Sequence, residues 1–79
     1  MKAKVFVTLK NGVLDPQGEA VLGALHSMGQ KSVKSLRQGK YFEVELESSD
    51  KSQAESTLKE ICGKVLANTV IENFKFELE

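Results

Sequence analysis

Few side chains in this sequence combine a type and a spacing that would support covalent chemistry. Nucleophilic catalysis requires a nucleophile with a general base within reach. The candidates are Cys62, the single cysteine, and His26, the single histidine. Cys62 lies on the apolar stripe of a predicted helix, where a free cysteine is usually a small buried residue. We therefore predict that Cys62 packs in the core and that His26 is an exposed or interface residue without a catalytic role.

A row of glutamates offers an acid–base pattern. Glu43, Glu45 and Glu47 alternate with apolar residues, so they share one face of a predicted strand with Tyr41. Paired carboxylates support acid–base catalysis when their surroundings separate their pKa values. A row of glutamates on one strand is more often a solvated face, and we predict no catalytic residues in this chain.

Two cations flank a predicted hairpin tip. Arg37 and Lys40 enclose Gln38-Gly39, and together they would suit a phosphate or an acidic partner. A phosphate cradle usually combines a glycine-rich backbone with a following helix N-terminus. Here there is one glycine and no such helix, so a solvated turn remains the alternative.

The charge balance limits the range of partners. The chain has 11 Lys and Arg against 11 Asp and Glu, a net charge of zero, which argues against binding to nucleic-acid backbones. No apolar run approaches the ~20 residues that cross a bilayer, and the first residues enter a strand pattern without an export signal. One unpaired cysteine suits a reducing compartment. We expect a cytoplasmic protein that binds no nucleic acid, membrane, metal or cofactor of its own.

Hydrophobic periodicity predicts six elements in one domain, residues 1–79. Alternation indicates strands, and an Asp15 N-cap followed by Pro16 indicates the start of a helix that ends before Gly29. Ser48-Ser49-Asp50 caps the second helix in the same way. The predicted elements are a strand at 3–9, a helix at 16–28, a weaker strand at 32–38, a hairpin at 38–40, a strand at 41–47, a helix from 51 to about 66 and a strand at 70–78.

The order β-α-β-β-α-β predicts an α+β, ferredoxin-like fold. In this architecture a four-stranded antiparallel sheet carries both helices on one face. A chain of 79 residues buries only a modest core. Chains of this size often gain stability from disulfides, metals or other chains. With one cysteine and one histidine, we expect other chains to supply that stability.

Two features predict contact with other chains. Gly23 lies inside a helix, where it costs about 1 kcal/mol relative to alanine. Its neighbours on the outer side of that helix are also small, so another backbone could approach closely there. Phe6 points to the mixed polar face of the sheet with Tyr41, and an aromatic side chain on such a face indicates contact with another chain.

Four short sequence segments, called sequence words below, are more specific indicators of a family than these patterns. They are LDPQGE at 14–19, ALHSMG at 24–29, RQGKYFE at 37–43 and LANTVIENF at 66–74. Together with the length and the order of elements, over nearly the whole chain, they resemble the PurS family. The members of that family are the small subunits of phosphoribosylformylglycinamidine synthase.

The resemblance implies a role in purine biosynthesis. In that family a small subunit without catalytic groups associates with itself, as a dimer or a dimer of dimers, and holds a glutaminase subunit to a large synthetase subunit. The synthetase uses ATP and Mg²⁺, and ammonia from glutamine, to convert formylglycinamide ribonucleotide to formylglycinamidine ribonucleotide. The chain would then be part of a C–N ligase and would assist the transfer of ammonia.

The resemblance also implies which residues shape subunit contacts. Asp15 and Gln17 would shape the loop and the first helix, and Arg37 and Lys40 would present polar contacts at the hairpin. The expected interface comprises Phe6, Asp15, Gln17, Gly23, His26, Arg37, Lys40, Tyr41, Asn68 and Glu72. The alternative function is a regulatory module of ferredoxin-like fold that binds a small effector.

Overall fold

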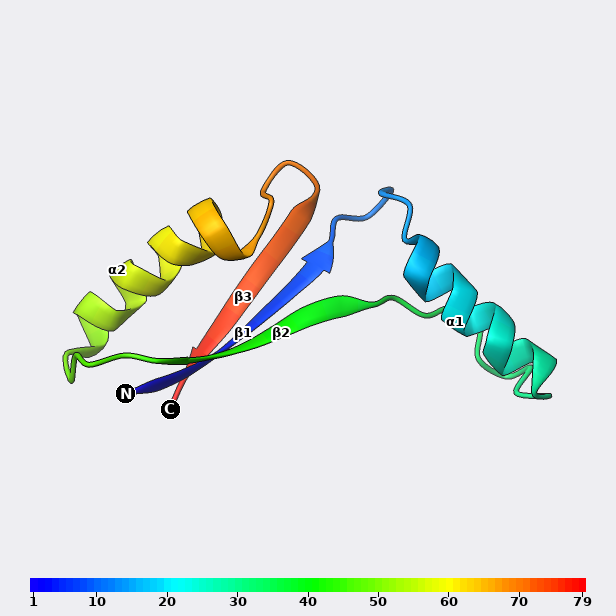
Figure 1. The fold of residues 1–79 in the computed structure, drawn as a ribbon, viewed down its shortest axis with the longest axis horizontal. Helices are drawn as coiled ribbons and strands as arrows, with labels where there is room; N and C mark the ends of the chain where they lie inside the picture. Colours follow the sequence, from blue (N-terminus) through cyan, green and yellow to red (C-terminus); the bar gives the residue numbers. More distant parts are fainter.

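The computed structural model describes residues 1–79 and contains one antiparallel sheet and two α-helices. The elements are β1 (Lys2–Leu9), α1 (Pro16–Ser27), β2 (Gly39–Glu45), α2 (Lys51–Ile61), a π-helical turn η1 (Cys62–Leu66) and β3 (Glu72–Leu78). The strand order is β2-β1-β3. The molecule is elongated, with extents of 49 × 25 × 14 Å, because α1 stands apart from the sheet (Figure 1).

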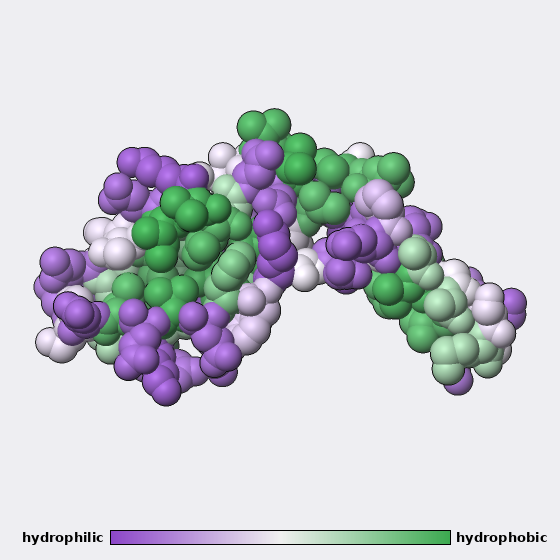
Figure 2. Space-filling model, in the orientation of Figure 1, coloured by the Kyte–Doolittle hydropathy of each residue, from purple (hydrophilic) through white to green (hydrophobic).

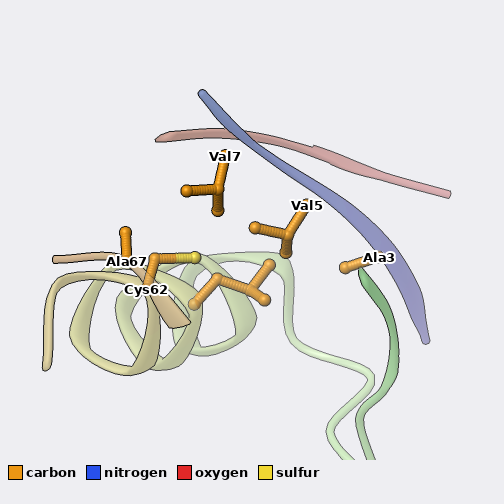
Figure 3. Close-up of a cluster of buried hydrophobic side chains, with 6 residues drawn as sticks. Ala3, Val5, Val7, Cys62 and Ala67 are labelled. Atoms are coloured by element: carbon orange, nitrogen blue, oxygen red, sulfur yellow. The ribbon is translucent and has the colours of Figure 1, made fainter. Parts of the chain in front are cut away.

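The core lies between the sheet and α2. Val5 and Val7 on the central strand are fully buried and belong to one cluster with Leu58 and Cys62 from the helical side (Figure 3). Alternation along β1 sends these valines to the covered face, as the sequence predicts. Cys62 is a buried free thiol, and its burial raises the pKa of that thiol. The prediction that Cys62 is a core residue is confirmed.

The second helix ends differently from the prediction. α2 begins as expected, with Asp50 Oδ1 accepting the Ser52 N–H at 3.0 Å. Beyond Ile61 the backbone widens into η1, where the Ala67 N–H donates to the Cys62 carbonyl oxygen at 2.9 Å. A π-turn spaces its hydrogen bonds one residue further apart than an α-helix, so it rotates the residues that follow. An α-helix continued through Val65 would place this residue on the same predicted apolar stripe as Leu58 and Cys62, but Val65 is 77% exposed.

The sheet has three strands, so the predicted four-stranded sheet is wrong at residues 32–38. This segment forms no strand in the structure. The predicted hairpin at 38–40 is also wrong, because Gly39 and Lys40 begin β2 and pair with Thr8 and Val7. A Cβ at Gly39 would overlap the Val7 carbonyl oxygen, so the close approach of the two strands requires glycine. The chain therefore runs from this segment directly into β2.

One helix covers the sheet, so the prediction of two helices on one face is wrong for α1. We call residues 10–38, which comprise α1 and its two flanking segments, the arm. α1 starts where predicted, with Asp15 as its N-cap, but it projects beyond the end of the sheet (Figure 1). Helical spacing puts Leu14 and Met28 on the same side as Leu25, the side that the sequence pattern assigns to the core, but they are 75% and 73% exposed. The hydrogen bonds at its base, described below, fix its position instead of an apolar contact with the sheet.

Two side-chain truncations test which residues of the α2 and η1 layer belong to the core. Leu58→Ala removes a fully buried side chain and leaves a cavity, so we expect it to lower the free energy of unfolding by about 2–4 kcal/mol. Val65→Ala, the control on η1, should change it by less than about 0.5 kcal/mol. Urea denaturation measures both values. Equal losses in the two variants would contradict this assignment of the core.

Candidate functional site

The arm joins the sheet through a cluster of polar side chains that we call the junction. It comprises Asp15, Gln17, Arg37, Gln38, Lys40 and Glu72. These residues come from three separate sequence words, and they meet where β1 ends and where β2 and β3 begin. All except Arg37 line an open hollow of about 200 Å³, together with Val7, Leu9 and Gly39. The tertiary structure thus brings five of the ten expected interface residues together at one end of the sheet.

Asp15 ties the first turn of α1 to the start of β2. Its Oδ1 accepts the Gly18 N–H at 3.0 Å, as expected of a helix N-cap. Its Oδ2 accepts the Gln38 N–H at 2.8 Å, across 23 positions of sequence. The N–H of Gln38 and then that of Gly18 hold the pKa of the Asp15 carboxyl below its ordinary value. One carboxylate therefore closes the base of the arm.

Two further side chains, which donate three hydrogen bonds, brace the same base. The Arg37 Nη2 donates to the Leu9 carbonyl oxygen at 2.8 Å and to the Lys10 carbonyl oxygen at 3.2 Å. Those carbonyl groups lie where β1 ends and the arm begins. The Arg37 guanidinium, near the other end of the arm, therefore joins the two ends of the arm. The Gln38 Nε2 also donates to the Gln17 Oε1 at 3.1 Å. The predicted hairpin cations are thus structural braces here, and Gln38, absent from the expected set, belongs with them.

The other half of the junction orders the entry to β3. The Lys40 Nζ lies 3.3 Å from the Glu72 Oε2, and the Glu72 Oε1 accepts the Asn68 N–H at 2.7 Å. The Asn68 N–H, and to a lesser extent Lys40, hold the pKa of the Glu72 carboxyl below its ordinary value. Asn68 in turn accepts the Val70 N–H through its Oδ1 at 3.2 Å.

His26 has a partner that its sequence position does not reveal. Its Nε2 lies 2.7 Å from the carbonyl oxygen of Val33, and because a carbonyl oxygen can only accept, that nitrogen carries the proton. The contact holds the segment that returns along α1 after Gly29. His26 is therefore half-buried within the arm rather than paired with a nucleophile.

The uncovered face of the sheet carries an aromatic pair at its centre. Phe6 and Tyr41 are cross-strand partners, with ring centroids 5.3 Å apart. Lys75, on the opposite side of Phe6, places its Nζ 5.2 Å from the centre of that ring. Lys4 pairs with Glu79 at 3.1 Å further along the same face. The predicted placement of Phe6 and Tyr41 on one mixed polar face is confirmed.

The arm and the ends of the sheet leave apolar groups exposed. Besides Leu14 and Met28, Val21 is 41% and Val70 is 80% exposed, and apolar surface extends over both the arm and the body (Figure 2). A Cβ at Gly23 would meet no atom within 4 Å, so the small-residue side of α1 is open as predicted. Neither helix is both long and apolar enough to cross a membrane.

The chemistry available to these groups is hydrogen bonding and ion pairing. No three His, Cys, Asp or Glu side chains are grouped to hold a metal ion, and every buried side-chain nitrogen and oxygen has a partner. The polar side chains of the junction make their short contacts with one another and with backbone groups. The fold and site define a small α+β protein whose polar residues brace a projecting arm.

Comparisons with known proteins show which family this chain belongs to. Residues 2–79 match the family model of PurS, phosphoribosylformylglycinamidine (FGAM) synthase. The chain is 53% identical to the PurS subunit of that synthase from Bacillus subtilis, over 99% of this chain and 92% of the relative. It is 45% identical to the PurS subunit from Synechocystis, over 95% of this chain and 75% of the relative. The chain belongs to the PurS family of phosphoribosylformylglycinamidine synthase subunits, in purine biosynthesis.

Solved structures agree with the open shape described above. The structure of Bacillus subtilis PurS superposes with a TM-score of 0.88 at 52% identity, over 99% of this chain and 96% of the other. A chain in the structure of PurLQS from Thermotoga maritima superposes with a TM-score of 0.88 at 32% identity, over 96% and 93%. Because the superpositions span nearly all of each chain, they include the arm.

The junction carboxylate Asp15 makes stability depend on pH. Its pKa is lower in the folded chain than in the unfolded chain, so its contribution is complete above the ordinary value of about 3.9 and is lost as pH falls through the folded value. We expect Asp15→Asn to lower the thermal midpoint at neutral pH, and the deficit to shrink below about pH 4. Thermal unfolding followed by circular dichroism across this range measures it.

Glu19→Gln is the matched control, because it removes one carboxylate from an exposed position in the same helical turn. We expect the pH profile of this variant to follow that of the unmodified chain. A deficit in the Asp15→Asn variant that stays constant from neutral to acidic pH would contradict the role of the ionised Asp15 carboxylate.

Proposed function

We propose that this chain is a non-catalytic subunit that bridges the glutaminase and synthetase subunits of phosphoribosylformylglycinamidine synthase and assists the transfer of ammonia between them. In this proposal the synthetase partner holds ATP and Mg²⁺, and the complex works in the cytoplasm. The observation that carries the proposal is the likeness over nearly the whole chain to PurS subunits, including a chain of the PurLQS structure.

The physical mechanism of such a subunit is tethering. Ammonia released at one active site diffuses into water unless the second active site is held close and in register. A bridging chain turns an encounter between separate enzymes into an intramolecular transfer, which raises the effective concentration of the intermediate. A rigid arm suits this role, because the junction fixes its direction through side-chain bonds at its base.

Three surfaces of the chain would contact the partner subunits. The junction presents Gln17, Lys40 and Glu72 around an open hollow. The uncovered face of the sheet presents the Phe6–Tyr41 pair, and α1 presents its small-residue side at Gly23. Self-association through a further part of the surface belongs to the same proposal, since a chain with this much exposed apolar surface gains stability from burying it.

Reconstitution from separate subunits tests the bridging role. With glutamine as nitrogen source, we expect the glutaminase and synthetase to form product at least about tenfold faster when this chain is present, because tethering limits the loss of ammonia. With an ammonium salt as nitrogen source, the synthetase should depend far less on the chain. The measurement is the rate of glutamine-dependent formylglycinamidine ribonucleotide formation.

The two nitrogen sources serve as internal controls for each other. A chain that merely stabilises the synthetase would raise both rates together. Equal glutamine-dependent rates with and without the chain would overturn the proposed function.

A second prediction concerns the small-residue side of α1. Gly23→Arg adds a long cation to an open helix surface where nothing lies within 4 Å, so the fold should be kept while close approach of a partner is blocked. We expect loss of co-elution with the glutaminase and synthetase on size exclusion, with an unchanged circular dichroism spectrum.

Gly63→Arg provides the comparison, because Gly63 also lies in a helical element with nothing within 4 Å of its Cβ position. This variant should still co-elute with the partners. If Gly23→Arg assembles as well as Gly63→Arg, then α1 does not dock through its small-residue side.

A further inference from the structure

The connection between β1 and α1 contains an asparagine followed directly by a glycine, Asn11-Gly12 (Figure 1). Both residues are exposed and lie in a turn, which the Val13 N–H closes by donating to the Lys10 carbonyl oxygen at 3.1 Å. Gly12 has a φ of +86°, a conformation that glycine adopts in turns without a steric cost. This turn is the first part of the arm, and the Asn11 side chain takes no part in the junction.

Asparagine is chemically labile because its side-chain amide can react with the backbone that follows it. The N–H nitrogen of the next residue attacks the side-chain carbon Cγ and loses its proton as a new C–N bond forms. The bond from Cγ to the side-chain nitrogen breaks, and that nitrogen leaves as ammonia. Water then opens the resulting cyclic imide at either of its two carbonyl carbons. One opening gives aspartate, and the other gives isoaspartate, whose main chain runs through the former side chain.

The structure leaves the reacting atoms of this turn accessible. The Gly12 N–H, which would supply the attacking nitrogen, donates to no group in the chain, so no hydrogen bond has to break. Glycine has no Cβ beside that nitrogen, and nothing lies within 4 Å of the ideal Cβ position at Gly12. Rotation of the Asn11–Gly12 peptide group towards the Asn11 Cγ therefore meets no packed side chain at Gly12.

The other two asparagines of the chain lack this combination of features. Asn68 is followed by Thr69, whose branched Cβ crowds the attacking nitrogen, and the Asn68 Oδ1 already accepts the Val70 N–H at 3.2 Å. Asn73 lies within β3, where it pairs with Thr8 and the ladder holds its backbone extended. All three asparagines are exposed, so the backbone around each one, and not exposure, distinguishes them.

We propose that Asn11 is a site of spontaneous deamidation and that its isoaspartyl product loosens the start of the arm. The reaction consumes water and releases ammonia, and it needs no enzyme, metal or oxidant. Each deamidated chain gains one carboxylate at residue 11, and the isoaspartyl form also gains one carbon atom in its main chain there. This modification is separate from the proposed bridging function, because it requires only the chain itself.

The position of this extra atom gives the modification its structural effect. Lys10 is held to the sheet, because its N–H donates to the Ile71 carbonyl oxygen at 2.8 Å. Its own carbonyl oxygen accepts both the Val13 N–H at 3.1 Å and the Arg37 Nη2 at 3.2 Å. The extra atom enters the short loop between Lys10 and Val13, so it changes the span that the Val13 bond closes and weakens that bond.

Peptide mapping by mass spectrometry tests the site on the isolated full chain after incubation at mildly alkaline pH. We expect the mass gain of amide-to-acid conversion at Asn11 to appear at least several-fold faster than at Asn68 or Asn73. The same samples should accept methyl groups from S-adenosylmethionine in the presence of an isoaspartyl methyltransferase. Conversion at Asn11 no faster than at Asn73 would overturn the proposal, as would conversion without methyl acceptance.

Asn11→Gln is the matched control for this experiment. It keeps an exposed side-chain amide before Gly12, but ring closure from the longer side chain gives a larger and less readily formed ring. The variant should retain the circular dichroism spectrum of the unmodified chain and should gain neither mass at residue 11 nor methyl groups there. Equal methyl acceptance by this variant and by the unmodified chain would place the reactive residue elsewhere and overturn the proposal.

Amide hydrogen exchange at Val13 tests the loosening. Asn11→Asp carries the new charge on an ordinary backbone, so it separates the effect of the carboxylate from that of the extra main-chain atom. We expect exchange at Val13 to be at least several-fold faster in the isoaspartyl chain than in the Asn11→Asp variant, which should match the unmodified chain. Equal exchange in the isoaspartyl chain and in Asn11→Asp would overturn the structural effect. Both experiments omit the glutaminase and the synthetase, so their outcome is independent of the bridging function.

Discussion

The hydrogen bonds of one carboxylate determine the shape of this chain. Asp15 accepts the N–H of Gly18 and the N–H of Gln38 at once, so the first turn of α1 and the start of β2 share one anchor. Gly39, the next residue after Gln38, is already paired with β1. The part of the arm between Asp15 and Gln38 therefore cannot turn back beside the sheet. The arm therefore projects, which leaves the outer edge of β2 open and α1 exposed.

Because the arm projects, α1 does not pack on the sheet and the core remains small. One helix covers the sheet, and eight of the 79 residues are buried, which is few for a chain that must offset its conformational entropy with apolar burial. The apolar surface on α1 and the free edge of β2 are the parts that a closed ferredoxin-like monomer would cover. Their exposure leaves this member of the PurS family with apolar surface and a strand edge that another chain can cover.

The residues that identify the family serve this architecture. Asp15, Gln17, Arg37, Lys40 and Glu72 lie in three distant sequence words, yet they meet at one junction. There they bond to other side chains of the junction or to backbone groups at the ends of strands and at the base of the arm. Such residues resemble a polar binding site when read one by one. In the fold, they join the base of the arm to the end of the sheet.

The sequence by itself determined the local elements: the alternation of β1, the caps at Asp15 and Asp50, the burial of Cys62 and the shared face of Phe6 and Tyr41. These depend on neighbours within a few positions or on a period of two residues. Only the tertiary structure decided that residues 32–38 pair with no strand, that α1 leaves the sheet, that η1 turns Val65 outward and that His26 binds Val33. Each of these depends on contacts or hydrogen-bond registers that residue spacing does not specify, because periodicity fixes which face of an element is apolar but not which chain or element covers it.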